Sequence, residues 1–280
     1  MTTPDAVETD LTDDSETSRL LRFLRWLGDR PFRGPRAFLA FIGGLTLTLA
    51  RGLRPSNWNR TLRAEFQLYC FQVGVKGLPA VVIVAVLIGV GMLVEGLYWL
   101  GLFGQRQLLG DLLALALIRE IAPTTVMLIV IGRSGSVMLD EIGQMVTGGQ
   151  LRMLSSHGID PLYYLLIPRT FAVAVSVFVL TMVFLPVAII AGFLAASALG
   201  VTNLSALDFA DEVLSAAGWA DYLLIPVKTL ITGYIIGFIS CVLGLEVQAG
   251  VHGIRRQLPK AFVLSLIATF LVGGLTSVLL

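Results

Sequence analysis

Charged residues are scarce in this chain of 280 residues: they make up 14% of the sequence, against 56% hydrophobic residues. A soluble domain carries about 25% charged residues, and several apolar runs here reach the roughly 18–20 residues that cross a bilayer as a helix. This composition excludes an ordinary soluble domain and indicates an all-α integral membrane protein. The net charge of +1 identifies no partner, and we expect no nucleic acid among the partners.

Cysteine and histidine are also rare, with two of each. Cys70 and Cys241 lie far apart in apolar contexts, which favours two buried thiols over a disulfide. The sequence contains no metal-ligand spacing, P-loop, nucleophile elbow or zinc-protease pattern. We therefore expect no metal and no catalytic residue in this chain, and any energy input must come from an ion gradient or from another subunit.

The N-terminal region lacks the apolar stretch of a signal peptide. Residues 1–18 are mostly acidic and polar, and we expect a disordered cytosolic tail there. Arginines then surround the short apolar run 37–50, which suits a helix lying in the membrane interface better than a span. We expect residues 19–77 to form basic interfacial helices.

Residues 78–280 predict a transmembrane domain of five helices. Arginine and lysine are concentrated in the N-terminal region and in the segments 140–169 and 247–260, which favours the cytoplasm for these parts. The N-terminus is then cytoplasmic and the C-terminus faces outward. The expected spans cover about residues 78–100, 112–138, 170–199, 222–245 and 261–280.

Two charged residues, Arg119 and Glu120, interrupt the apolar sequence of the second span. Ionised groups in hydrocarbon are costly unless paired or hydrated, so they mark a functional pathway by default. Pro123 removes the backbone hydrogen bond to the carbonyl of Arg119, which frees an acceptor and favours a kink. The alternative to a functional site is an ion pair with another helix, with Lys228 or Glu95 as the partner.

Small residues follow on the same helix. They are Gly132, Gly135 and Ser136, and the first and last have the i, i+4 spacing that permits close approach of another helix, which is chiefly a packing signal. Arg133 is expected about 20 Å from Glu120 at 1.5 Å per residue. At that depth it can snorkel to the cytoplasmic face or bind phosphate, and a role in packing or topology is favoured.

Residues 150–154, between the second and third spans, predict a short helix with Leu151 and Leu154 on one face. Gly148 and Gly149 precede it, and a Gly-Ile-Asp-Pro sequence ends it. A short helix with a small apolar face suits docking into a groove of a partner. An interfacial connector fits the pattern about equally well.

An ordered series of short motifs runs through the chain, each weak by itself. The series is Gly77-Leu78-Pro79, Gly89, Arg119-Glu120 with Pro123, Gly132-Arg133 with Gly135-Ser136, Glu141 with Gly143 and Met145, Gln150, Asp160-Pro161, and Pro168-Arg169. In this order the motifs resemble the permease subunit of the MlaE/YrbE family, the membrane component of MCE-type ABC lipid transporters. The likeness covers roughly Arg36 to the C-terminus.

The resemblance implies a dimer of permeases in a bacterial inner membrane, bound to two cytosolic ATPases and capped outside by a ring of MCE proteins. Such a system moves phospholipids or similar lipids between the inner membrane and the outer envelope. It implies no cofactor in this chain, because ATP and Mg would bind the ATPase. The lipid-binding candidates carried over are Leu93, Leu97, Arg119, Glu120 and Thr124. The ATPase-coupling candidates are Glu141, Gln150, Leu151, Leu154, Asp160 and Arg169.

The chain departs from the family pattern on the expected cytoplasmic face. Gly149 replaces the usual glutamate, Arg152 stands where an acid is usual, and Val146 replaces an arginine; residues 253–259 replace a small, Thr-rich loop. These departures favour an altered ATPase partner or a heterodimer with a second permease. The competing hypotheses are a membrane-embedded enzyme that acts on lipids with Glu120 as general base, and a scaffold that transports nothing.

Overall fold

The computed structural model describes residues 35–54, 58–102, 114–156, 161–200, 215, 218–247 and 253–278. Within these ranges it is helical with no strand, and five helices are long and apolar enough to cross a membrane. This confirms the all-α class and agrees with an integral membrane protein of five spans. The expected tail over residues 1–18 lies outside the described residues.

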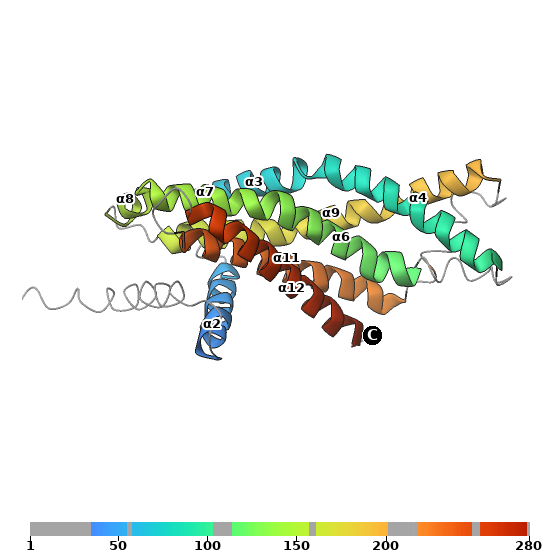
Figure 1. The fold of residues 1–280 in the computed structure, drawn as a ribbon. Helices are drawn as coiled ribbons and strands as arrows, with labels where there is room; N and C mark the ends of the chain where they lie inside the picture. Colours follow the sequence, from blue (N-terminus) through green and yellow to red (C-terminus); the bar gives the residue numbers. More distant parts are fainter. Residues whose placement is uncertain are drawn as a thin grey trace, which may run out of the picture.

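The five long helices form an antiparallel bundle (Figure 1). The short helix α8 (Gln150–Ser156) connects the second helix to the third. We call the end of the bundle that holds α8 the α8 end, and the other end the opposite end. The bundle helices are α4 (Leu78–Leu102), the segmented second helix η4 (Ala114–Ile121), α6 (Ala122–Val130), η5 (Ile131–Gly135) and α7 (Ser136–Thr147), then α9 (Pro161–Ala198), α11 (Trp219–Leu245) and α12 (Gly253–Val278).

Helix α9 is the centre of the bundle and contacts α4, α6 and α11. Glycines bring its neighbours close: a Cβ built on Gly89 of α4 would overlap the carbonyl oxygen of Ala188, and one on Gly237 of α11 would lie 3.0 Å from the Cα of Thr170. In a bilayer the lipid tails are as apolar as the helices, so close packing is a main source of attraction between helices. These glycines therefore hold α4 and α11 against α9.

The expected close packing is not seen at Gly132 within the described chain. No atom lies within 4 Å of the position that a Cβ on Gly132 would take, and Gly135 lies against Ser240 of α11 instead. The local helix is η5, a π-helix, whose i→i+5 bonding widens the turn and changes which residues share a face. Of the two glycines, Gly135 is therefore the one that packs against α11.

In the part of the chain that the structure describes, two α-helices that differ in direction precede α4 (Figure 1). The first crosses the bundle axis near the α8 end, which is the direction expected of an interfacial helix. The second runs along the bundle and continues through a short π-helix into α4. They are α2 (Pro35–Gly52), α3 (Arg60–Cys70) and the π-helix η2 (Phe71–Val75).

Helix α3 runs along the bundle, and the expectation that residues 19–77 form basic interfacial helices stays a prediction. Leu62, Tyr69 and Val73 form a stripe along α3 and η2 that is buried against the bundle, and α3 contacts α9. The continuous helix over Arg60–Gly96 has 37 residues. At 1.5 Å per residue it is about 55 Å long, far longer than the roughly 30 Å hydrocarbon core. Its charged end, α3, is therefore the part that extends beyond the apolar layer.

Candidate functional site

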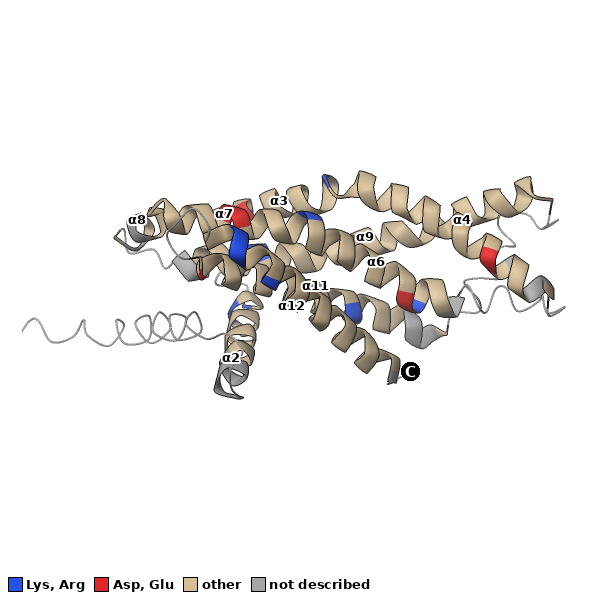
Figure 2. Cartoon of the chain, viewed as in Figure 1, with Lys and Arg blue, Asp and Glu red and all other residues tan. Residues whose placement is uncertain are grey.

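Charged residues are few in the half of the bundle away from α8, and they gather on α4, just before α6 and on α11 (Figure 2). Lys228 of α11, which is 5% exposed, donates hydrogen bonds to Glu120 Oε1 at 2.8 Å and to the carbonyl oxygen of Arg119 at 3.1 Å. Ser277 of α12 donates to the same carboxylate oxygen. We call Arg119, Glu120, Lys228 and Ser277 the Glu120 cluster. It joins the second, fourth and fifth helices of the bundle.

The local sequence explains why Lys228 finds two acceptors here. The π-helix η4 ends at Ile121, and Pro123 occupies the first turn of α6. Because proline has no backbone N–H, the carbonyl of Arg119 lacks the usual helical donor, and the ammonium of Lys228 takes that place. The carbonyl of Arg119 thus accepts a hydrogen bond from another helix, and Lys228 is the ion-pair partner of Glu120. Glu95 accepts a hydrogen bond from Trp99 at 3.1 Å instead.

The two ions of the cluster differ in exposure. The side chain of Lys228 is 6% exposed, whereas that of Glu120 is 45% exposed. A buried ammonium requires a counter-charge and hydrogen-bond acceptors, and Glu120 with the Arg119 carbonyl supplies both. Glu120 satisfies Lys228 with one oxygen while part of its carboxylate stays accessible at the protein surface. Sequence reasoning missed Ser277, because a serine near the end of an apolar helix carries no distinctive signal.

The remaining lipid-binding candidates lie around this cluster in different environments. Leu93 is 1% exposed and packs with Ile118, Ala196 and Ile225, so it cannot contact lipid in this conformation. It shares a face of α4 with Gly89, one turn away, and Gly89 brings that face against α9. Thr124 is half-buried. The side chain of Leu97 is not among those that the structure describes. Lipid binding by Leu93, Leu97 and Thr124 stays a prediction.

A second group of polar side chains lies at the α8 end. The guanidinium of Arg169, 2% exposed, lies over the ring of Tyr69 at 4.4 Å from the centroid. Tyr69 donates a hydrogen bond to Glu141 Oε2 at 2.7 Å, and Gln72 donates to Glu141 Oε1 at 2.9 Å. These contacts tie α3, α7 and α9 together. Two coupling candidates, Glu141 and Arg169, are therefore engaged within the chain, and the burial of Arg169 prevents direct contact with another subunit in this conformation.

The other coupling candidates lie on or near α8. Leu151 and Leu154 are half-buried and pack against the core, while Gln150 is exposed. Met153, on the other side of the helix, is 66% exposed. The i, i+3 pair thus packs against this protein's own bundle in this conformation, and its role in ATPase coupling stays a prediction. Asp160 lies outside the described residues.

Glu246, directly after α11, gives the α8 end a pH-dependent group. Burial raises the pKa of Glu246 to about 7, partly offset by Lys260, and among the described residues neither carboxylate oxygen has a hydrogen-bond partner. Because the pKa is higher in the folded than in the unfolded state, folding is favoured when Glu246 is protonated. This contribution is complete below about pH 4 and is lost as the pH rises through 7.

We expect Glu246→Gln to raise the free energy of unfolding at pH 8 by about 1–2 kcal/mol, after allowance for partial solvent screening. The gain should be much smaller at pH 5, where the native glutamate is already protonated. Thermal denaturation in detergent at both pH values measures the difference, with the exposed Glu95→Gln as the control. An equal gain at both pH values would contradict the assignment.

Comparison with known proteins agrees with the resemblance noted from the motifs. Residues 67–279 match the protein family described as Permease MlaE. The chain is 28% identical over 230 residues to the protein TRIGALACTOSYLDIACYLGLYCEROL 1, chloroplastic, of Arabidopsis thaliana, covering 82% of this chain and 63% of that protein. It is 32% identical over 169 residues to a probable ABC transporter permease protein of Synechocystis sp., covering 60% of this chain and 64% of that protein.

A third relative is the intermembrane phospholipid transport system permease protein MlaE of Haemophilus influenzae. It is 34% identical over 136 residues, which cover 48% of this chain and 52% of that protein. This chain thus spans between about half and two thirds of the length of these curated relatives. The family match, by contrast, runs from the end of α3 through α12 and includes all four residues of the Glu120 cluster. This chain belongs to the MlaE permease family.

Proposed function

We propose that this chain is the membrane-spanning permease of an ATP-driven transporter that moves phospholipids or similar lipids. The observation that carries the proposal is the Glu120 cluster, in a chain of the MlaE permease family: a buried lysine and a half-exposed glutamate inside otherwise apolar helices. Intramembrane ions that remain accessible are typical of a transport pathway. The phospholipid substrate is supported by the name of the Haemophilus influenzae relative.

In this proposal the accessible side of Glu120 faces a lipid cavity shared with a second permease copy. Arg119 and Thr124 lie within one turn of Glu120 on the same helix, and Leu97 of α4 is a further candidate for lipid contact. Leu93 would reach a lipid only if α4 moved away from α9, because it is 1% exposed. The permease pair would lie in a bacterial inner membrane with the N-terminus and the α8 end in the cytoplasm, and an MCE ring at the opposite end.

The energy would come from a separate ATPase that binds ATP and Mg. A tagged full chain, purified in mild detergent from its native membranes, should retain an ATPase. The purified complex should transfer a fluorescent phospholipid between vesicle populations only when ATP is hydrolysed. Purification without any ATPase, or transfer that is the same with and without ATP, would overturn the proposal.

The ATPase contact is proposed at α8, where Met153 offers the exposed apolar side chain. We expect Met153→Asp to lower ATPase retention at least about tenfold, because the substitution places a charge in an apolar contact. Ser156→Asp adds the same charge to an exposed polar position of the same helix and should retain the ATPase. Pull-down with quantitative immunoblotting measures retention.

Leu154→Asp would not distinguish a lost ATPase contact from local unfolding, because Leu154 packs against the core of this chain. Loss of the ATPase in that variant would follow from local unfolding as well as from a lost contact. Equal retention by the native chain and Met153→Asp would exclude α8 as the apolar contact.

Departures from the family pattern have structural accounts within this chain. Gly149 has a φ of 75°, a left-handed conformation that favours glycine over the usual glutamate and ends α7 ahead of α8. Val146 packs partly buried against the core. The segment from residue 253 is not a loop but the start of α12, where Ile254 and Leu258 pack beside Leu139. The side chain of Arg152 lies outside the described ones.

These local adaptations favour a partner ATPase whose groove differs from the family's usual one, or a heterodimer in which a second permease carries the usual coupling residues. Mass spectrometry of the purified complex distinguishes the two. One permease species bound to the ATPase would exclude the heterodimer.

A further inference from the structure

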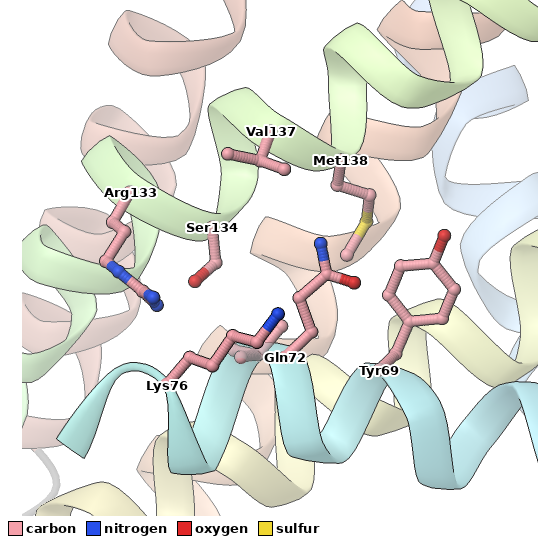
Figure 3. Close-up of a pocket in the computed structure, with 8 residues that line it drawn as sticks. Tyr69, Gln72, Lys76, Arg133, Ser134, Val137 and Met138 are labelled. Atoms are coloured by element: carbon pink, nitrogen blue, oxygen red, sulfur yellow. The ribbon is translucent and has the colours of Figure 1, made fainter.

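A small hollow of about 130 Å³ lies between the α3–η2 segment and the η5–α7 segment. Figure 3 shows its lining in close-up: Lys76 and Arg133 extend toward the same space from facing helices, and the hydroxyl of Ser134 points into it. The side chain of Gln72 lies between Lys76 and Tyr69 on the same side. Neither Lys76 nor Arg133 has a role in the lipid or ATPase contacts proposed above, so the pair of cations in this hollow calls for an explanation of its own.

The charges around the hollow are unbalanced. Among the described residues that line it, none is acidic. The nearby carboxylate of Glu141 already accepts hydrogen bonds on both oxygens, from Tyr69 and Gln72. Two cations that face one space repel each other, and an anion between them would be attracted by both. The guanidinium of Arg133 can donate two parallel hydrogen bonds to a phosphate, while Lys76 supplies a point charge.

The position of the hollow along the bundle indicates where the anion comes from. Lys76 lies two residues before α4, whose 25 residues are apolar except for Glu95. This helix is about 37 Å long at 1.5 Å per residue and so covers the roughly 30 Å hydrocarbon core. Lys76 is then at the level where hydrocarbon gives way to lipid headgroups. Arg133, on the facing helix, lines the hollow at the same level.

Apolar side chains flank the cations and are exposed to the surroundings. Val75 is 56% exposed, Leu78 is 37% exposed and Val137, which lines the hollow, is 44% exposed. Lys76 and Arg133 are themselves exposed, and two accessible cations beside exposed apolar side chains suit a ligand with a charged head and acyl chains. The volume is sufficient for a phosphate group but not for a whole lipid, so the chains would lie outside, along these apolar residues.

We propose that this hollow binds a phosphate group between Lys76 and Arg133, with Ser134 as a further hydrogen-bond donor, and that an anionic phospholipid headgroup supplies it. Free phosphate offers the same chemistry and is the alternative source. The site is separate from the Glu120 cluster, since Arg133 is about 20 Å from Glu120 along the helix. Its occupancy does not depend on the proposed transport function, and binding can be measured without transport.

The test uses the full chain, with any subunits that copurify, in detergent. Native mass spectrometry measures retention of phosphatidylglycerol and of diacylglycerol, which has the same chains but no phosphate. A parallel titration with inorganic phosphate, followed by calorimetry, tests the free anion. We expect phosphatidylglycerol to be retained and diacylglycerol to be lost. The double variant Lys76→Gln/Arg133→Gln should weaken phosphatidylglycerol binding at least about tenfold, because two charge-assisted contacts are removed.

The matched control is Arg63→Gln/Arg256→Gln, which removes two exposed cations that do not line this hollow and should retain the lipid. Val137→Asp provides a second variant, because it adds an anion to the lining and leaves both cations in place. It should also release phosphatidylglycerol. Lys76→Arg/Arg133→Lys keeps both charges but changes the donor geometry, and should weaken binding less than the double glutamine variant.

Each outcome decides between the sources or removes the proposal. Inorganic phosphate binding that depends on Lys76 and Arg133, without retained phosphatidylglycerol, would assign the site to the free anion. Equal phosphatidylglycerol retention by the native chain, the double variant and the control would overturn the site. Retention of diacylglycerol equal to that of phosphatidylglycerol would also overturn it, because the phosphate would then contribute nothing.

Discussion

Replacing Gly89 by alanine should lower the free energy of unfolding by about 3 kcal/mol, at the upper end of the range for overpacked sites. A Cβ at this position would overlap the backbone carbonyl of Ala188 on α9. Backbone atoms inside a helix cannot move as a flexible side chain can, so the whole of α4 would have to shift away from α9. The contact that buries Leu93 would loosen in the same movement.

Gly91 provides the matched control on the same helix. A Cβ built there meets no atom within 4 Å. Gly91→Ala should therefore raise the free energy of unfolding by no more than about 1 kcal/mol, because alanine favours a helix more than glycine does. Thermal denaturation of both variants in the same detergent measures the difference. Equal stability of the two variants would show that α4 and α9 are not held together at Gly89.

Removing the carboxylate of Glu120 should destabilise the protein more than removing the ammonium of Lys228. Glu120→Gln leaves a lysine that is 6% exposed without its counter-charge, whereas Lys228→Met leaves a carboxylate that is 45% exposed and can be hydrated. We expect a loss of about 2 kcal/mol for Glu120→Gln, reduced from the usual cost of breaking a buried pair because Glu120 is half exposed. Lys228→Met should cost about 1 kcal/mol or less.

The double variant Glu120→Gln/Lys228→Met should be more stable than Glu120→Gln alone, because it removes the unpaired buried charge. Unfolding of the four proteins by a denaturing detergent completes the cycle, and Glu95→Gln, at an exposed acid of α4, is the control. Additive effects of the two substitutions would show that the pair contributes no coupling.

The same variants separate packing from transport. If the accessible part of Glu120 contacts lipid, the double variant should recover stability while its ATP-dependent phospholipid transfer stays low. Native transfer by the double variant would assign the Glu120 cluster to helix packing alone. This contrast cannot be made with Glu120→Lys, which changes the charge of the pathway and leaves two cations beside the carbonyl of Arg119.

Much of the fold follows from composition and local sequence. Long apolar runs predict the spans because a helix satisfies its own backbone hydrogen bonds, and such runs need no information about neighbours. The loss of the α-helical donor to the carbonyl of Arg119 is equally local, since it depends only on the proline four residues later. For the same reason the short helix α8 could be predicted from the sequence between its glycine and proline boundaries.

Local sequence does not decide which neighbour covers a helical face. Arg60–Cys70 has the basic composition of an interfacial helix, and the structure adds that its apolar stripe packs along α9 and leads into α4. Leu154 stays a predicted coupling residue, and in this conformation its face of α8 packs against the core while Met153 is exposed. Amphipathic spacing identifies a face that will be covered, but not whether the same chain or a partner covers it.

The sequence by itself determined the class of protein, its five spans and the presence of charges inside them, because hydropathy and helix bonding act over neighbouring residues. Only the tertiary structure decided which charges meet. Glu120 and Lys228 are 108 residues apart and pair because α11 lies beside the second helix. Lys76 and Arg133 face one hollow because two separate helices lie alongside each other there. Such contacts depend on how whole helices pack, which no local pattern in the chain records.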